Sequence, residues 1–207
     1  GQADHRCALA PVNGEWHIAQ RFAIDWVQAD QEGYLVRGDP AVNSDFVCYG
    51  ADLLAVEDGI VASILDGVPD QTAGVLSTEM PVEELGGNHI MLDIGNGYYV
   101  TYAHVKSGSL LVSEGDRVRK GQVLGKLGNS GHSSAPHLHF HVTKGLSPLI
   151  FGAEGVPFVF DALELQGQAT ASSLEGAFKG APLNIVAPQD GVGSRSGQMP
   201  ADRTVVR

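Results

Sequence analysis

The stretch SSAPHLHFHV, residues 133–142, places three histidines at every second position. The alternation of His137, His139 and His141 with apolar residues predicts a short β-strand, in which successive side chains point to opposite faces. The three imidazoles are therefore expected on one face, at roughly 7 Å per two residues. One zinc ion cannot bind all three, because its histidine ligands lie at about 2.0–2.1 Å whereas the outer two of the row are about 13 Å apart. The other ligands of such a site must come from elsewhere in the chain.

The rest of the sequence predicts an all-β protein with antiparallel strands. Twenty-seven glycines and short alternating runs bounded by Gly, Asn, Asp and Pro indicate strands joined by tight turns, whereas helix signals are scarce. The GNGY stretch at 95–98 is expected to be a hairpin turn. Such short spacing favours a β-sandwich or a partly closed barrel. The expected strands are residues 17–27, 52–56, 59–66, 89–95, 97–105, 117–128 and 136–143.

Two long connections and a C-terminal tail interrupt this regular succession of short strands and tight turns. The connections at 28–49 and 68–87 are expected to form rims or flaps of a functional site. Residues 1–166 are predicted to form one β domain. From Gly167 onward the chain is rich in Gly, Ala, Ser and Pro, so residues 167–207 are expected to be an extended arm and not a second domain.

Composition narrows the classes of partner. The 207 residues carry 24 acidic against 13 basic side chains, a net charge of −11, and no basic cluster longer than DRVRK at 116–120. Nucleic acid and anionic membrane surfaces are therefore not expected as partners. No apolar run approaches the roughly 18 residues of a transmembrane helix, and the first residues lack the pattern of a signal peptide. Cys7 and Cys48 are the only cysteines, and either one disulfide or two buried thiols fit them.

Several separated blocks between Phe22 and Thr143 resemble, in the same order, the lysostaphin-type (LytM-like) zinc endopeptidases of bacterial cell-wall turnover. GNHIMLDIGNGYYVTYAHV at 87–105 is similar to that family's hairpin ending in Tyr-Ala-His. SEGDRVRKGQVLGKLGNSGHSSAPHLHFHV at 113–142 is similar to its Gly-Asp turn and closing His-Leu-His strand, and YGADLLAVEDGIVASI at 49–64 to its upstream stretch. The resemblance implies a β-sandwich of the duplicated-hybrid-motif type, with a groove that takes an extended peptide.

The resemblance also implies roles for individual residues. His139 would be a zinc ligand, while His104 and His137 would be the catalytic histidines beside the water and the scissile carbonyl. The family's other two ligands form a His-x-x-x-Asp motif, which falls at RFAID, residues 21–25. Asp25 matches as a metal ligand, but Arg21 stands at the histidine position. A guanidinium stays protonated and has no lone pair for a metal, so the implied site lacks one ligand.

Three interpretations of the missing ligand remain open. His17, which would share a strand face with Asp25, could substitute for it, and His5, His89 and His132 are further histidines in the sequence. The fold could instead persist without metal, with Arg21 and Asp25 forming an ion pair. A two-ligand site completed by water or substrate would hold metal weakly. His141, which stands where the family usually has Glu, is interpreted as a strand residue or as an outer-shell partner.

Two functional hypotheses follow from the resemblance. The first is an extracytoplasmic zinc metalloendopeptidase that hydrolyses peptide bonds in peptidoglycan or in Gly-rich peptides. The second is a catalytically degenerate module that binds peptidoglycan or peptide, or regulates, after loss of the metal. The turn at 114–125 also occurs in lipoyl- and biotin-carrier barrels, but the lysine tip that bears their cofactor is missing here, so that likeness concerns the fold alone.

Overall fold

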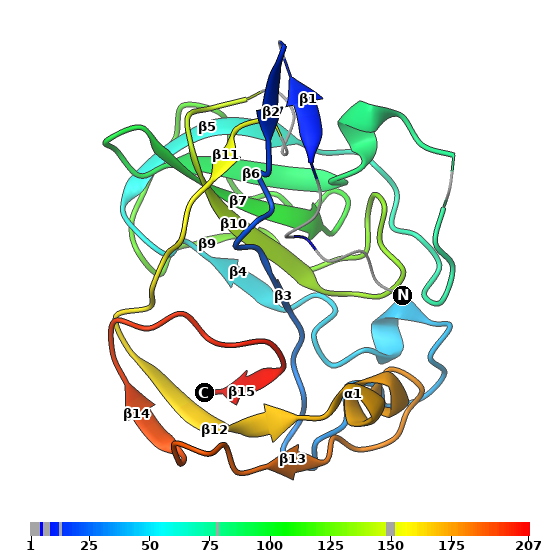
Figure 1. Ribbon diagram of the computed structural model, residues 1–207. Helices are drawn as coiled ribbons and strands as arrows, with labels where there is room; N and C mark the ends of the chain where they lie inside the picture. Colours follow the sequence, from blue (N-terminus) through cyan, green and yellow to red (C-terminus); the bar gives the residue numbers. More distant parts are fainter. Residues whose placement is uncertain (1–4, 6–8, 13, 78, 148–151) are drawn as a thin grey trace.

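The computed structural model describes residues 5, 9–12, 14–77, 79–147 and 152–207 (Figure 1). Its main body is a seven-stranded antiparallel sheet in the order β11-β10-β7-β6-β5-β8, with β3 also paired to β10. The fold is therefore the all-β, antiparallel one that the sequence predicts. The strands of this sheet are β3 (Ile24–Trp26), β5 (Gly59–Leu65), β6 (Asn88–Asp93), β7 (Tyr98–Val105), β8 (Arg117–Val118), β10 (Leu138–Lys144) and β11 (Glu154–Gly155).

The centre of the sheet follows the hydrophobic alternation of the sequence. The expected hairpin turn at 95–98 joins β6 and β7, and the Tyr98 N–H donates to the Gly95 carbonyl over 3.0 Å. Tyr102 of β7 lies opposite Phe140 of β10, and their rings pack edge to face at 5.4 Å. Both side chains belong to a buried apolar cluster with Ile90 and Leu92 of β6. The opposite face of β10 is left to His139 and His141.

The segment at 17–27 is not the continuous strand expected from its sequence. β2 (Glu15–His17) pairs with β1 (Ala10–Val12) in a separate hairpin, which projects at the top of Figure 1, and β3 begins only at Ile24. Two tight turns lie between them, in which the Arg21 N–H donates to the Ile18 carbonyl and the Ala23 N–H to that of Gln20. These turns break the alternation of faces between residues 17 and 25.

The two long connections lie where they are expected. The first runs from β3 to β4 (Asp52–Leu54) through the 3-10 helix η2 (Asn43–Asp45), and the second runs from β5 to β6 through η3 (Val82–Glu84). The expected strand at 117–128 is instead two short strands, β8 and β9 (Val123–Lys126), and β9 pairs with β4 in a small sheet of its own.

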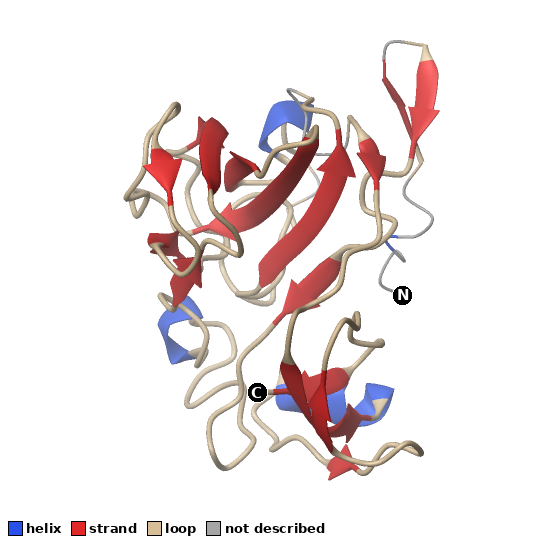
Figure 2. Cartoon of the chain, turned by 90° about the vertical axis from the view of Figure 1, so that its left-hand side faces the viewer, coloured by secondary structure: helices blue, strands red, loops and turns tan. Residues whose placement is uncertain are grey.

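The chain after Gly167 is folded and not extended. β12 (Leu163–Ala169) is the centre of a four-stranded antiparallel sheet with β13 (Ile185–Val186), β14 (Gly193–Arg195) and β15 (Thr204–Val206). Helix α1 (Ala171–Ala177) begins after Thr170, whose hydroxyl accepts from the Ser173 N–H. Leu165, Gly167 and Ala169 alternate with more exposed residues along β12. Two of the small residues that suggest an arm, Gly167 and Ala169, therefore lie on the buried face of a strand. Figure 2 shows the strands and the helix of this part of the chain near the C-terminus.

A second apolar cluster joins the C-terminal helix to the main body. Ala177 of α1 and the next residue, Phe178, pack with Leu35 and Phe46 of the first long connection. Cys48 lies in the same cluster as a buried free thiol that donates to the Pro136 carbonyl, whereas Cys7 lies outside the described residues. No helix in the described part of the chain is long and apolar enough to cross a membrane.

Candidate metal centre

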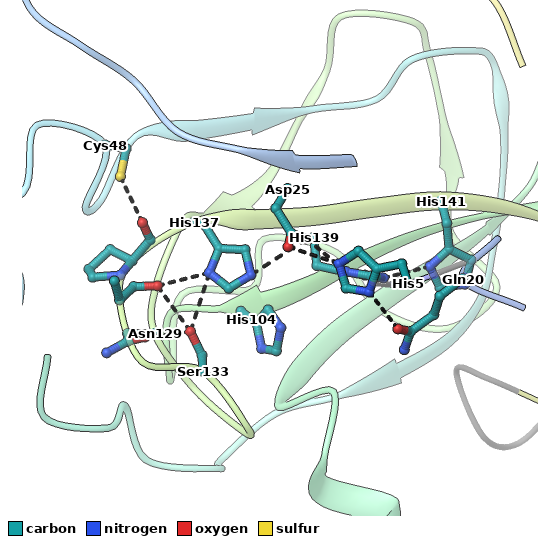
Figure 3. A network of polar contacts seen from close by, with 12 residues as sticks. His5, Gln20, Asp25, Cys48, His104, Asn129, Ser133, His137, His139 and His141 are labelled. Carbon is teal, nitrogen blue, oxygen red and sulfur yellow. Dashed lines mark hydrogen bonds and ion pairs between the residues drawn. The ribbon is translucent and has the colours of Figure 1, made fainter. Parts of the chain in front are cut away.

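Asp25 and His139 meet because their strands pair. In the antiparallel ladder of β3 and β10, Asp25 lies directly opposite His139. Paired residues of neighbouring strands point to the same face, so the two side chains come together. His139 Nδ1 lies 2.9 Å from Asp25 Oδ1 (Figure 3). The two metal ligands implied by the family resemblance are thus neighbours across a strand pair.

His104 reaches this face through a β-bulge. Along β7 it would follow Tyr102 into the apolar cluster, since residues two apart share a face. Between the pairs Ile90–Tyr102 and Asn88–Val105, however, two residues of β7 oppose one residue of β6. His104 adopts a left-handed backbone, with φ of 60°. The bulge turns its ring toward the row of histidines, 4.6 Å from the ring of His137 and 6.0 Å from that of His139.

Backbone carbonyls fix the tautomers of both implied catalytic histidines. His104 Nδ1 lies 2.7 Å from the Ser130 carbonyl oxygen, and His137 Nδ1 lies 2.8 Å from that of Ala135. A carbonyl oxygen only accepts, so each ring carries its proton on Nδ1 and keeps the lone pair of Nε2. The Nε2 atom of His137 lies 3.7 Å from Asp25 Oδ1.

The electrostatic environment keeps the site in a form that can bind a cation. Burial would raise the pKa of Asp25, but hydrogen bonds from His139 and His5 and the nearby ring of His137 outweigh it and hold this pKa far below its usual range. Burial lowers the pKa of His104, and the rings of His137 and His139 act in the same direction. Burial also lowers the pKa of His139, although Asp25 opposes the shift. An ionised carboxylate therefore lies beside the neutral imidazoles of His104 and His139 at pH 7.

His5 joins Asp25 and His139 from the N-terminal end of the chain. Its Nε2 lies 2.9 Å from Asp25 Oδ2, and its ring packs edge to face on that of His139 at 4.9 Å. The ligand atoms of the three residues all lie within 4.8 Å of one another. The sequence offers His5 only as one of several spare histidines, since nothing in its neighbourhood resembles a motif.

His17 and Arg21 lie elsewhere. The His17 ring lies 3.7 Å from a carboxylate oxygen of Glu15 and 4.0 Å from one of Glu154, and the metal-ligand group of the described residues does not include it. The Arg21 guanidinium is half exposed and lies 3.9 Å from Glu154, so it does not form the ion pair with Asp25 that one of the three interpretations assumes. Both differences follow from the turns between β2 and β3, which direct residues 17 and 21 away from the face of Asp25.

The remaining histidines divide into one neighbour of the site and two others. His141 is completely buried, and its Nδ1 lies 2.9 Å from His139 Nε2, as expected of an outer-shell partner. His89 is buried with its Nδ1 on the Gly87 carbonyl, and burial lowers its pKa. His132 is exposed on the loop before β10.

The donor set fits a catalytic zinc site. Two imidazoles and one carboxylate are a common set of three protein ligands for zinc, which leaves a fourth position for water or substrate. The side chains of Asp25 and His5 are 41% and 31% exposed, so solvent reaches one side of the group. His139 is buried on the other side.

Comparison with known protein families gives a match to the part of the chain that carries most of these histidines. The model of peptidase family M23 matches residues 45–150, a span that holds His104, His137 and His139 but not His5 or Asp25. The peptidoglycan DD-endopeptidase ShyA of Vibrio cholerae is 34% identical over 133 residues, which cover 64% of this chain and 26% of ShyA. The glycyl-glycine endopeptidase ALE-1 of Staphylococcus capitis is 45% identical over 56 residues, 27% of this chain and 15% of ALE-1.

Solved structures of similar proteins match more loosely. The catalytic domain of the prophage-encoded M23 protein EnpA from Enterococcus faecalis aligns with a TM-score of 0.39 and 20% identity, over 65% of this chain and 87% of that domain. The catalytic domain of lysostaphin from Staphylococcus simulans aligns with a TM-score of 0.35 and 25% identity, over 56% and 80% of the two chains.

Proposed function

Since the chain belongs to peptidase family M23, we propose that it is a zinc endopeptidase that hydrolyses peptide bonds of peptidoglycan or of Gly-rich peptides outside the cytoplasm. One observation carries the proposal: Asp25, His139 and a further imidazole form a three-ligand group, with His104 and His137 beside it. The chain spans about a quarter of ShyA. The substrate classes and the extracytoplasmic location follow from the activities for which ShyA and ALE-1 are named.

Zinc bound by such a group supplies a Lewis acid that polarises a carbonyl and lowers the pKa of a water toward about 7. His104 and His137 then provide the proton chemistry. Each ring donates its Nδ1–H to a backbone carbonyl and is thereby held in one orientation. Each Nε2 can accept a proton from the attacking water, and the protonated ring can donate it to the departing amine or hydrogen-bond the oxyanion.

The environment of His104 suits it to accept a hydrogen bond from the attacking water. Its lowered pKa keeps the ring neutral at pH 7, so the lone pair of Nε2 is available without prior loss of a proton. Its left-handed backbone is a costly conformation for a residue other than glycine, and such strain occurs where the surrounding structure holds a side chain for function. The neighbouring ring of His137, 4.6 Å away, can act on the same substrate group.

The degenerate alternative has less support. It expects Arg21 to neutralise Asp25, but Arg21 lies beside Glu154 while the Asp25 carboxylate lies between His5 and His139. A carboxylate and two imidazoles that are kept together in this way retain the lone pairs that a metal needs.

The test is digestion of purified peptidoglycan, of cross-linked stem-peptide dimers and of pentaglycine by the zinc-loaded protein, with new amino termini identified by mass spectrometry. We expect cleavage of at least one of these substrates, loss of cleavage in a chelator, its return with zinc, and no cleavage by the His139→Ala variant. Sedimentation with peptidoglycan and no released product from zinc-loaded protein would instead establish the binding module.

A further inference from the structure

We infer that His5 is the third zinc ligand of this chain and replaces the histidine that the family motif would place at Arg21. The inference rests on the proposed zinc site and extends it to a segment that the family match at 45–150 does not include. It assigns a ligand that lies 20 residues before Asp25 in the sequence and that reaches the site over the fold.

The distances are those of a site that needs little adjustment to hold zinc. Ligand bonds of about 2.0–2.1 Å in a tetrahedral arrangement place the ligand atoms about 3.3 Å apart. Here Asp25 Oδ2 lies 2.9 Å from His5 Nε2, and Asp25 Oδ1 lies 2.9 Å from His139 Nδ1. When one ligand atom is taken from each of the three residues, these atoms lie within 4.8 Å of one another. Small rotations of the side chains, without movement of a strand, would therefore bring them to one ion.

An outer-shell hydrogen bond prepares each imidazole. His5 Nδ1 lies 2.8 Å from Gln20 Oε1, so that Nδ1 carries the proton and donates it to the amide oxygen. Without a metal the Nε2–H of His5 donates to Asp25, and a metal that displaces this proton would bind the Nε2 lone pair. His139 has the same arrangement with its nitrogens exchanged, because Nε2 lies 2.9 Å from His141 Nδ1 while Nδ1 faces Asp25 (Figure 3). Zinc-binding histidines are typically oriented by such partners.

The position of Arg21 makes room for this ligand. Its guanidinium lies 3.9 Å from Glu154 and packs against the ring of Phe22. The cation is thus held by a carboxylate outside the metal group, and the Asp25 carboxylate remains open to His5. Gln20, the residue just before Arg21, contributes the hydrogen bond to His5. The turn that removes residue 21 from the site therefore presents residue 20 to the replacement ligand.

Zinc affinity of three variants tests the assignment. His5→Ala and His5→Gln each remove the proposed ligand, and His17→Ala is the matched control because it removes the histidine that sequence spacing favours. Zinc dissociation constants are measured by competition with a chromophoric chelator, and the visible spectrum of the Co²⁺ form reports the ligand geometry. Thermal unfolding in chelator shows whether each variant folds as the parent does.

We expect both His5 variants to bind zinc at least about 100-fold more weakly, because loss of an outer-shell partner alone costs about 10–100-fold. The Co²⁺ spectrum should change with them, while His17→Ala leaves both properties unchanged. Parental zinc affinity in the folded His5 variants, or loss of zinc in His17→Ala, would overturn the assignment. Loss of zinc in the His5 variants without any peptide cleavage by the parent would refute the proposed function and leave the assignment standing.

Discussion

Asn88 ties the second long connection to the strand that carries His104, and its removal should destabilise the protein strongly. The side chain is completely buried. Its Oδ1 accepts from the Val68 N–H over 2.8 Å, and its Nδ2 donates to the carbonyls of Val68 and Val105 over 2.8 and 3.0 Å. In Asn88→Ala, the Val105 carbonyl keeps a bond from the Ser130 hydroxyl, but both backbone groups of Val68 lose this partner.

The expected loss of stability follows from the N–H and the carbonyl group of Val68. A buried backbone group left without a partner costs about 1–3 kcal/mol, so Asn88→Ala should lower the free energy of unfolding by about 2–6 kcal/mol. Urea unfolding followed by tryptophan fluorescence measures this loss, and the slope of the free energy of unfolding against urea concentration should stay unchanged. The matched control is Asn184→Ala, because Asn184 is exposed, and its loss should stay within about 0.5 kcal/mol. A loss below about 1 kcal/mol for Asn88→Ala would refute the argument that this network holds the connection in place.

Three further predictions concern the site and its surroundings. His137→Ala and His104→Asn, the latter chosen because Asn tolerates the left-handed backbone, should lower kcat by about 10²–10⁴-fold with zinc content unchanged; equal loss of zinc would show that these rings are ligands. Arg21→Gln should leave the zinc dissociation constant unchanged, since the guanidinium lies beside Glu154, and a tighter constant would show that Arg21 opposes the metal. Burial raises the pKa of the Cys48 thiol to about 11, so in a Cys7→Ser background it should react with a disulfide reagent at pH 8 only after unfolding, and rapid reaction of the native protein would contradict the assigned burial.

The sequence predicts the parts of the fold that depend on local alternation. Strands β5, β6, β7 and β10 lie where period-two patterns of apolar residues place them, because one face of each is buried against the same core. The hairpin turn at 95–98 follows from the preference of Asn and Gly for positive φ, which both Asn96 and Gly97 adopt. Alternation alone does not predict that Asp25 pairs with His139, because this pairing depends on which strands become neighbours. The family resemblance is what implies that the two residues share a site.

Alternation fails where the backbone departs from a regular strand. The segment at 17–27 has the pattern of one strand, which predicts His17 on the face of Asp25, but the turns at 18–23 remove that relation. The same pattern would place His104 on the apolar face with Tyr102. A two-against-one bulge turns it to the opposite face, and beside this bulge the Asn88 N–H donates to the Ser130 hydroxyl. At Gly87, a Cβ would come within 2.4 Å of Ser130, which shows how closely these loops approach.

The proposed third ligand, His5, shows how a metal site can be complete although its sequence motif is incomplete. A His-x-x-x-Asp motif predicts a shared site from the spacing of two residues, whereas the fold decides whether their side chains meet. Here the turn between β2 and β3 places the Arg21 guanidinium beside Glu154 and outside the metal group. His5 does not depend on a fixed spacing from Asp25 in the sequence. Its ring is oriented by the hydrogen bond of Nδ1 with Gln20, and its Nε2 lies beside the Asp25 carboxylate. The number of metal ligands is therefore a property of the folded site. The imidazole that is missing at position 21 of the motif is supplied by His5, whose distance from Asp25 in the sequence follows no known motif.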